Sequence, residues 1–164
     1  MEKKVIIING TGGSGKDTFV NQVQSFAPEP IANLSTVDQI KQVAVMLGWN
    51  GDKEEKSRKF LSDLKDLWTE YSDGPFNDIL SRIEKTKANI CFVHCREPEE
   101  IKRFANHYGN NCITLLIKRK DHKTKGNHAD EGVEHYKYDI VINNDSDINN
   151  LQKKAINFYS SIIN

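Results

Sequence analysis

Short apolar runs alternate along this chain with longer segments in which apolar residues recur at helical spacing. The short runs cover residues 5–9, 31–36, 90–93, 113–117 and 138–142. This alternation is typical of βαβ units, in which helices cover both faces of a parallel sheet. The pattern therefore predicts an α/β fold.

Helical patterns occupy the segments between these runs, and two of them carry a clear apolar stripe. Helices are expected at about 15–26, 38–47, 52–71, 76–85, from Pro98 onward and at 151–163, with a turn at 73–75. Apolar residues at helical spacing predict one buried face on each helix. In the 52–71 helix the expected inward residues are Phe60, Leu61, Leu64, Leu67 and Trp68. In the last helix they are Leu151, Ala155, Ile156, Phe158, Tyr159 and Ile162.

Length and charge limit the possible classes of protein. A chain of 164 residues suits a single domain, expected here over residues 1–164. The formal net charge of zero argues against nucleic-acid and membrane-surface partners. Since no apolar run approaches a membrane span or a signal peptide, a cytoplasmic protein is expected. Its cysteines, Cys91, Cys95 and Cys112, form no CxxC pair and are predicted to be buried, reduced thiols.

A glycine-rich loop follows the first apolar run and opens the first helix. The match to G-x-x-x-x-G-K ends in lysine at the required position, in the strand-to-helix context that the phosphate-binding mechanism needs. Glycines let main-chain N–H groups turn inward, and the helix N-terminus adds partial positive charge. We therefore expect nucleotide phosphates to be bound by Gly10, Thr11, Gly12, Gly13, Ser14, Gly15, Lys16, Asp17 and Thr18.

Asp17 departs from the common loop, which carries serine or threonine as a Mg²⁺ ligand at this position. A carboxylate is also a hard oxygen ligand, so Asp17 and Thr18 are the predicted metal residues, with the Thr18 hydroxyl on a phosphate oxygen. Without the ion, Asp17 would repel a triphosphate. Nucleotide binding is therefore expected to depend strongly on Mg²⁺.

The segment SGKDT at 14–18 resembles the phosphate loop of the deoxynucleoside monophosphate kinases of phages and bacteria. Residues 37–41, VDQIK, are similar to the family's A-D-P-L-K segment, and residues 95–100, CREPEE, to its V-R-F-P-N-E segment. Residues 128–131, HADE, and 138–145, YDIVINND, are similar to its H-x-S-E and Y-D-x-x-I-x-N-D segments. The resemblance spans nearly the whole chain, although only the glycine loop is highly specific.

This resemblance implies a three-layer α/β/α P-loop NTPase fold with strand order 2-3-1-4-5 and a lid at about 119–136. It also implies ATP and Mg²⁺ as cofactors and transfer of the γ-phosphoryl group to a nucleoside monophosphate, with a deoxynucleotide expected. Partners would be a nucleoside triphosphate and a small phosphorylated acceptor, bound by a monomer or homodimer. The alternatives are a kinase of another acceptor such as dephospho-coenzyme A, and a P-loop ATPase or nucleotide sensor.

Phosphoryl transfer relies on positioning and charge neutralisation, so basic groups should converge on the phosphates. The expected catalytic residues are Lys16, Asp38, Arg96 and Arg119, and the expected acceptor-binding residues are Asp38, Lys41, Arg58 and Arg96. Solvated charge is the competing interpretation for Arg58 and Arg119, and a helix N-terminal role is the competing interpretation for Asp38. His94 stands where such enzymes carry an acidic residue, and a neutral imidazole is a poor Mg²⁺ ligand.

Overall fold

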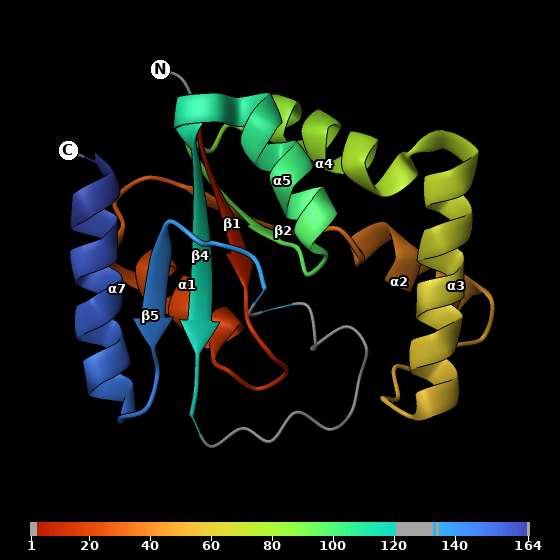
Figure 1. Cartoon of the computed structure of the whole chain (residues 1–164), viewed down its shortest axis with the longest axis horizontal. Helices are drawn as coiled ribbons and strands as arrows, with labels where there is room; N and C mark the ends of the chain where they lie inside the picture. The colour runs from red at the N-terminus through yellow and green to blue at the C-terminus, as the bar shows by residue number, and fades with distance from the viewer. Residues whose placement is uncertain (1–2, 121–132, 134, 164) are drawn as a thin grey trace. The chain divides into compact units, whose positions relative to one another are not determined.

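The computed structural model describes residues 3–120, 133 and 135–163. Its centre is a five-stranded parallel sheet of order β2-β3-β1-β4-β5, which confirms the predicted fold class. The strands are β1 (Lys4–Asn9), β2 (Ile31–Ser35), β3 (Ile90–His94), β4 (Cys112–Lys118) and β5 (Ile140–Asn143). Figure 1 shows the β4 and β5 arrowheads at the edge of the sheet where the loop after β1 turns into the first helix.

The chain divides into two compact units. Residues 1–33 and 87–164 form the phosphate-loop unit, and residues 34–86 form the helical unit. The expectation of one domain over the whole chain stays a prediction.

In the phosphate-loop unit, alternate residues of β1 face opposite sides of the sheet, because side chains alternate along a strand. Ile6 and Ile8 are fully buried in a cluster with residues of α1 (Lys16–Phe26) and α7 (Ile148–Ile163). The ring centroids of Phe19 on α1 and Phe158 on α7 lie 5.5 Å apart, in an edge-to-face contact. α5 (Pro98–Tyr108) packs against β1 and β4. Helices therefore flank this part of the sheet.

The predicted inward face of α7 is nearly right. Leu151, Ala155, Phe158, Tyr159 and Ile162 are buried as predicted. Ile156 is 42% exposed, which contradicts its predicted inward position. Ile156 directly follows Ala155, and adjacent residues of a helix point in different directions.

β5 begins at Ile140, later than the predicted 138, because Asp139 makes side-chain bonds to the neighbouring strand. Thr114, which is buried in β4, donates its N–H and its hydroxyl to Asp139 Oδ2 at 2.8 and 2.7 Å. In return, the Asp139 N–H donates to Thr114 Oγ1 at 2.9 Å. These three bonds join the start of β5 to β4.

The helical unit contains α2 (Asp38–Met46), α3 (Glu55–Ser72) and α4 (Gly74–Lys85). α4 starts at Gly74, where a turn was expected, since Pro75 suits the first helical turn. The buried stripe predicted for the second of these helices is wrong: α3 has no buried residue, and Leu67 is 64% exposed. Within this unit α3 packs against α2 and α4, which leaves its apolar face partly covered.

The three cysteines are free thiols: Cys91 and Cys95 are buried, whereas Cys112 is half-buried. Burial raises the pKa of the Cys91 thiol, and it raises the pKa of Cys112 to about 12 with help from the nearby Asp139 carboxylate. A short 3₁₀ helix, η1 (Gly109–Asn111), leads into β4. In the part of the chain that the structure describes, no helix has the length and apolar character of a membrane span.

Candidate functional site

The loop between β1 and α1 has positive φ angles at Gly10, Gly13 and Gly15, and at the first and last of these a side chain would also collide with its surroundings. Gly10 has φ +151°, and a Cβ there would lie 2.4 Å from the main-chain oxygen of Ile117. Gly15 has φ +99°, and a Cβ there would lie 2.4 Å from Asn144 Nδ2. Side chains are thus excluded by both conformation and space, as a loop that folds closely round a phosphate requires.

The Lys16 ammonium group lies against the loop that precedes it. Lys16 Nζ donates to the main-chain oxygens of Gly10 at 2.5 Å and Thr11 at 3.0 Å. The full positive charge is therefore held by the glycine loop at the N-terminus of α1, where the helix dipole is also positive. Among the described residues, Ser14 Oγ is the one buried side-chain polar atom without a hydrogen-bond partner.

Asn144, which follows β5, is hydrogen-bonded to the phosphate loop. Its Nδ2 donates to the main-chain oxygen of Ser14 at 2.9 Å, and its N–H donates to Lys118 O at 2.7 Å. The side chain is buried, so these bonds are shielded from water. The ends of β4 and β5 therefore fix the position of the phosphate loop.

Asn9 makes a second set of bonds at the start of the loop. Its Oδ1 accepts the Gly10 N–H at 2.8 Å, while its Nδ2 donates to Arg96 O at 3.1 Å and to Tyr138 Oη at 2.7 Å. Tyr138 Oη donates in turn to Val133 O at 2.8 Å. Burial raises the pKa of the Tyr138 phenol to about 12. The neutral phenol thus joins the loop to the segment that precedes β5.

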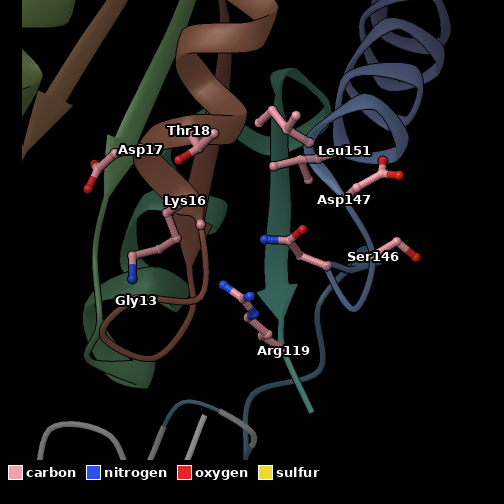
Figure 2. A pocket seen from close by; sticks show the side chains of 11 residues that line it. Gly13, Lys16, Asp17, Thr18, Arg119, Ser146, Asp147 and Leu151 are labelled. Atoms are coloured by element: carbon pink, nitrogen blue, oxygen red, sulfur yellow. The ribbon is translucent and has the colours of Figure 1, made fainter. Parts of the chain in front are cut away.

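A cavity of about 470 Å³ opens beside the loop, within the size range of small-molecule sites. Figure 2 shows Arg119, just after β4, with its guanidinium directed towards the loop that carries Lys16. The predicted residues Lys16, Asp17, Thr18 and Arg119 therefore lie round one cavity. The lining is completed by Gly13, Gly15, Asn144, Ser146, Asp147, Ile148 and Leu151.

Five of these residues, from 144 to 151, were absent from the expected site. The signal that could have found them is the end of the fifth strand, because ligands of open α/β sheets bind at the carboxyl ends of the strands. Residues 144 and 145 lie within the segment 138–145 that resembles the family, but the resemblance gave neither a role in the site. Leu151 was expected only as an inward position of the last helix, and Ile148 lay before the expected helix start at 151, because exposure to a cavity depends on the packed structure.

Asp17 lies on the β3 side of α1, as Figure 2 shows. The Asp17 Oδ1 atom lies 3.8 Å from Nε2 of His94, the last residue of β3. The same Nε2 lies 2.9 Å from Oδ1 of Asn33 in β2. Asp17 and His94 thus lie together, while the pairing of Asp17 with Thr18 on one metal ion stays a prediction.

A group of ligand-type atoms also follows β3. Those of Cys95, Glu97 and Glu100 lie within 4.8 Å of one another, and Cys95 Sγ donates to Glu100 Oε2 at 3.2 Å. That hydrogen bond accounts for the approach of the thiol and the carboxylate. Arg96, between them in sequence, is exposed, and its carbonyl is fixed by Asn9.

The remaining expected residues belong to the helical unit. Asp38 Oδ2 accepts the Ser35 N–H at 2.9 Å and lies 2.9 Å from Arg82 Nη2, which supports a structural role for this carboxylate. Arg82, which sequence reasoning missed, also pairs with Asp78 at 3.3 Å. Asp38 and Arg82 are 44 residues apart in sequence, so no local sequence pattern could predict their pairing.

Two basic residues of the helical unit were expected to bind the acceptor. Arg58 Nε donates to the Lys53 main-chain oxygen at 2.9 Å, and Lys41 is exposed on α2. Acceptor roles for both stay predictions. Of the expected lid, residues 121–132 and 134 lie outside the described residues.

Comparisons with known proteins support the fold. No family model matches the sequence, and no curated protein matches it. Solved structures match over almost the whole chain. TT1252 from Thermus thermophilus is 15% identical, with 99% of each chain covered and a TM-score of 0.57. Shikimate kinase from Aquifex aeolicus is 15% identical, with 96% of each chain covered and a TM-score of 0.55. Dephospho-CoA kinase from Campylobacter jejuni is 16% identical, with 98% of this chain and 97% of that chain covered and a TM-score of 0.53. At these identities the likeness shows the fold alone.

Proposed function

We propose that this protein transfers the γ-phosphoryl group of ATP to a small phosphorylated acceptor, with a nucleoside monophosphate, in particular a deoxynucleotide, as the leading candidate. The observation that carries the proposal is the glycine loop with Lys16, set beside a cavity of about 470 Å³. Kinase structures of the same fold support the reaction class. The choice of nucleotide acceptor rests on the resemblance of the sequence segments.

The cavity suits the nucleotide donor. Main-chain N–H groups of the loop and the Lys16 ammonium supply positive potential for the phosphates. Beyond them, Ile148 and Leu151 give apolar surface, and the Arg119 guanidinium gives a flat cation on which a base can stack. We infer that the phosphates lie on the loop and the base lies between Arg119 and the start of α7.

In this proposal Lys16 and Arg96 act on the transferring group, whereas Arg119, which the sequence also suggested for that role, is assigned to the base. Lys16 and Arg96 each offer positive charge where negative charge accumulates on phosphoryl oxygens, the main requirement of this reaction. Asp38, Lys41 and Arg58 are proposed to contact the acceptor. The bonds of Asp38 to Ser35 and Arg82 fix the position of its carboxylate.

A divalent cation is expected with the nucleotide. The oxygens of Asp17 and Thr18 fit a hard cation such as Mg²⁺, whereas the imidazole of His94 does not. The donor set next to the loop therefore differs from the usual one.

The direct test is the formation of ADP and phosphorylated product with a panel of ribonucleoside and deoxynucleoside monophosphates and dephospho-coenzyme A. Turnover that requires one acceptor supports the proposal and identifies the substrate. ATP hydrolysis at one rate with and without every acceptor contradicts it and favours an ATPase or nucleotide sensor, which His94 in place of an acidic group also favours.

A variant pair tests the proposed placement of the base. Arg119→Ala is expected to weaken ATP binding about tenfold, from the loss of a stacked cation worth about 0.5–2 kcal/mol. Lys102→Ala removes an exposed charge on α5 and is the control. Equal losses in the two variants would contradict the placement, because general charge rather than stacking would then explain the effect.

A further inference from the structure

His94 Nε2 lies close to one side-chain oxygen from each of two other elements, and its contact with Asn33 is a hydrogen bond. Asn33 Oδ1, from β2, lies 2.9 Å from this nitrogen, and Asp17 Oδ1, from the first turn of α1, lies 3.8 Å from it. The set therefore holds one imidazole nitrogen, one amide oxygen and one carboxylate oxygen. All three residues belong to the phosphate-loop unit.

These separations match those between ligands of a single small cation. With metal–ligand bonds of about 2.1 Å, ligand atoms lie about 3.0 Å apart at neighbouring octahedral positions, about 3.4 Å apart in a tetrahedron and about 4.2 Å apart at opposite positions. The observed 2.9 and 3.8 Å fall at or within these limits. The distances from His94 Nε2 to the two oxygens are therefore compatible with ligands of one ion.

The Asp17 side chain is free to rotate towards an ion, whereas the His94 side chain is held in place. The Asp17 side chain is 87% exposed, so its carboxylate can turn without disturbing the core. The His94 side chain is only 16% exposed and is held by β3, which gives the ion a fixed nitrogen ligand. Asn33 and His94 lie on adjacent strands of the sheet.

We propose that Asp17, Asn33 and His94 form a divalent cation site that prefers first-row transition metals such as Mn²⁺, Co²⁺ or Zn²⁺ over Mg²⁺. Mg²⁺ takes oxygen ligands and gives up its water reluctantly, whereas imidazole is a good ligand for the transition metals. The ion replaces the proton on Nε2, and the ring carries its hydrogen on Nδ1. The inference deepens the proposed function, because the same ion can take phosphate oxygens of the nucleotide at its remaining positions.

The test uses Mn²⁺ as the probe, since its electron spin senses directly bound nitrogen. Protein with Mn²⁺ is measured by electron spin echo envelope modulation, once without nucleotide and once with ATP. We expect ¹⁴N modulation in the wild type, its loss in His94→Asn and its retention in His107→Asn, which changes a histidine on α5. Circular dichroism establishes that each variant is folded.

Competition gives a second readout. In the wild type Mg²⁺ should displace Mn²⁺ poorly, and His94→Asp should improve the competition by Mg²⁺ about tenfold or more, the size of effect seen when metal surroundings are altered. Absence of ¹⁴N modulation in both wild-type samples overturns the cation site, as does modulation that persists in His94→Asn. The sample without nucleotide tests the cation site even if ATP does not bind. Failure of ATP to bind is a separate outcome, which counts against the proposed function.

Discussion

Replacing Gly15 with alanine is expected to destabilise the protein through two separable effects at the phosphate loop. At φ +99° an alanine is strained, which costs about 1–2 kcal/mol. Its Cβ would also lie 2.4 Å from Asn144 Nδ2 and displace the amide that donates to Ser14 O. A lost hydrogen bond of this kind costs about 0.5–1.5 kcal/mol, so the sum is about 1.5–3.5 kcal/mol. The protein should still fold, since domains are stable by about 5–15 kcal/mol.

The assay is urea unfolding followed by circular dichroism, with the slope of the transition checked for constancy. Gly12→Ala is the matched control, because Gly12 lacks a positive φ and a Cβ there would meet nothing within 4 Å. In an Asn144→Ala background the clash is gone, so Gly15→Ala should then cost only the strain of about 1–2 kcal/mol. An equal cost of Gly15→Ala in both backgrounds would refute the role of Asn144.

Three further outcomes follow from bonds outside the loop. The pKa of the Tyr138 phenol is raised from 10.0 to about 12, so the stability that the neutral phenol contributes is complete below pH 10 and is lost as the pH rises towards 12. Alkaline unfolding should therefore show a loss of stability between pH 10 and 12 in the wild type that is smaller in Tyr138→Phe. Thr114→Val should lower the free energy of unfolding by about 1–3 kcal/mol, since it removes one of the two donors to the Asp139 carboxylate and leaves the Asp139 N–H without its acceptor, while Thr114→Ser should retain most of it. A double-mutant cycle on Asp38 and Arg82, which are partly exposed, should give a coupling of about 0.5–1 kcal/mol, and zero coupling would show that this ion pair has no stabilising role.

The phosphate loop could be predicted from sequence because its requirements are local. Glycines, a lysine at a fixed spacing and a preceding strand determine the conformation of residues 10–18, and the structure shows Gly10 and Gly15 in the expected backbone state. The strand order came from the resemblance and is confirmed by the sheet. Both depend on short-range patterns that survive in a single sequence.

The other wall of the cavity could not be predicted in this way. Asn144 reaches Ser14 across 130 residues, and only the parallel pairing of β1, β4 and β5 brings the two together. Helix α3 illustrates the opposite error: its apolar spacing is clear, but burial depends on what packs against it, and Leu67 is left largely exposed. Periodicity identifies the helix but not the extent to which its face is covered.

Calorimetric titration of ATP into the wild type and Lys16→Met tests the central claim most directly. Loss of charge-assisted hydrogen bonds worth about 1.5–3 kcal/mol should weaken binding roughly ten- to a hundredfold. Lys102→Met, on the exposed side of α5, should bind ATP as the wild type does. Unchanged ATP affinity in Lys16→Met would contradict phosphate binding by this loop.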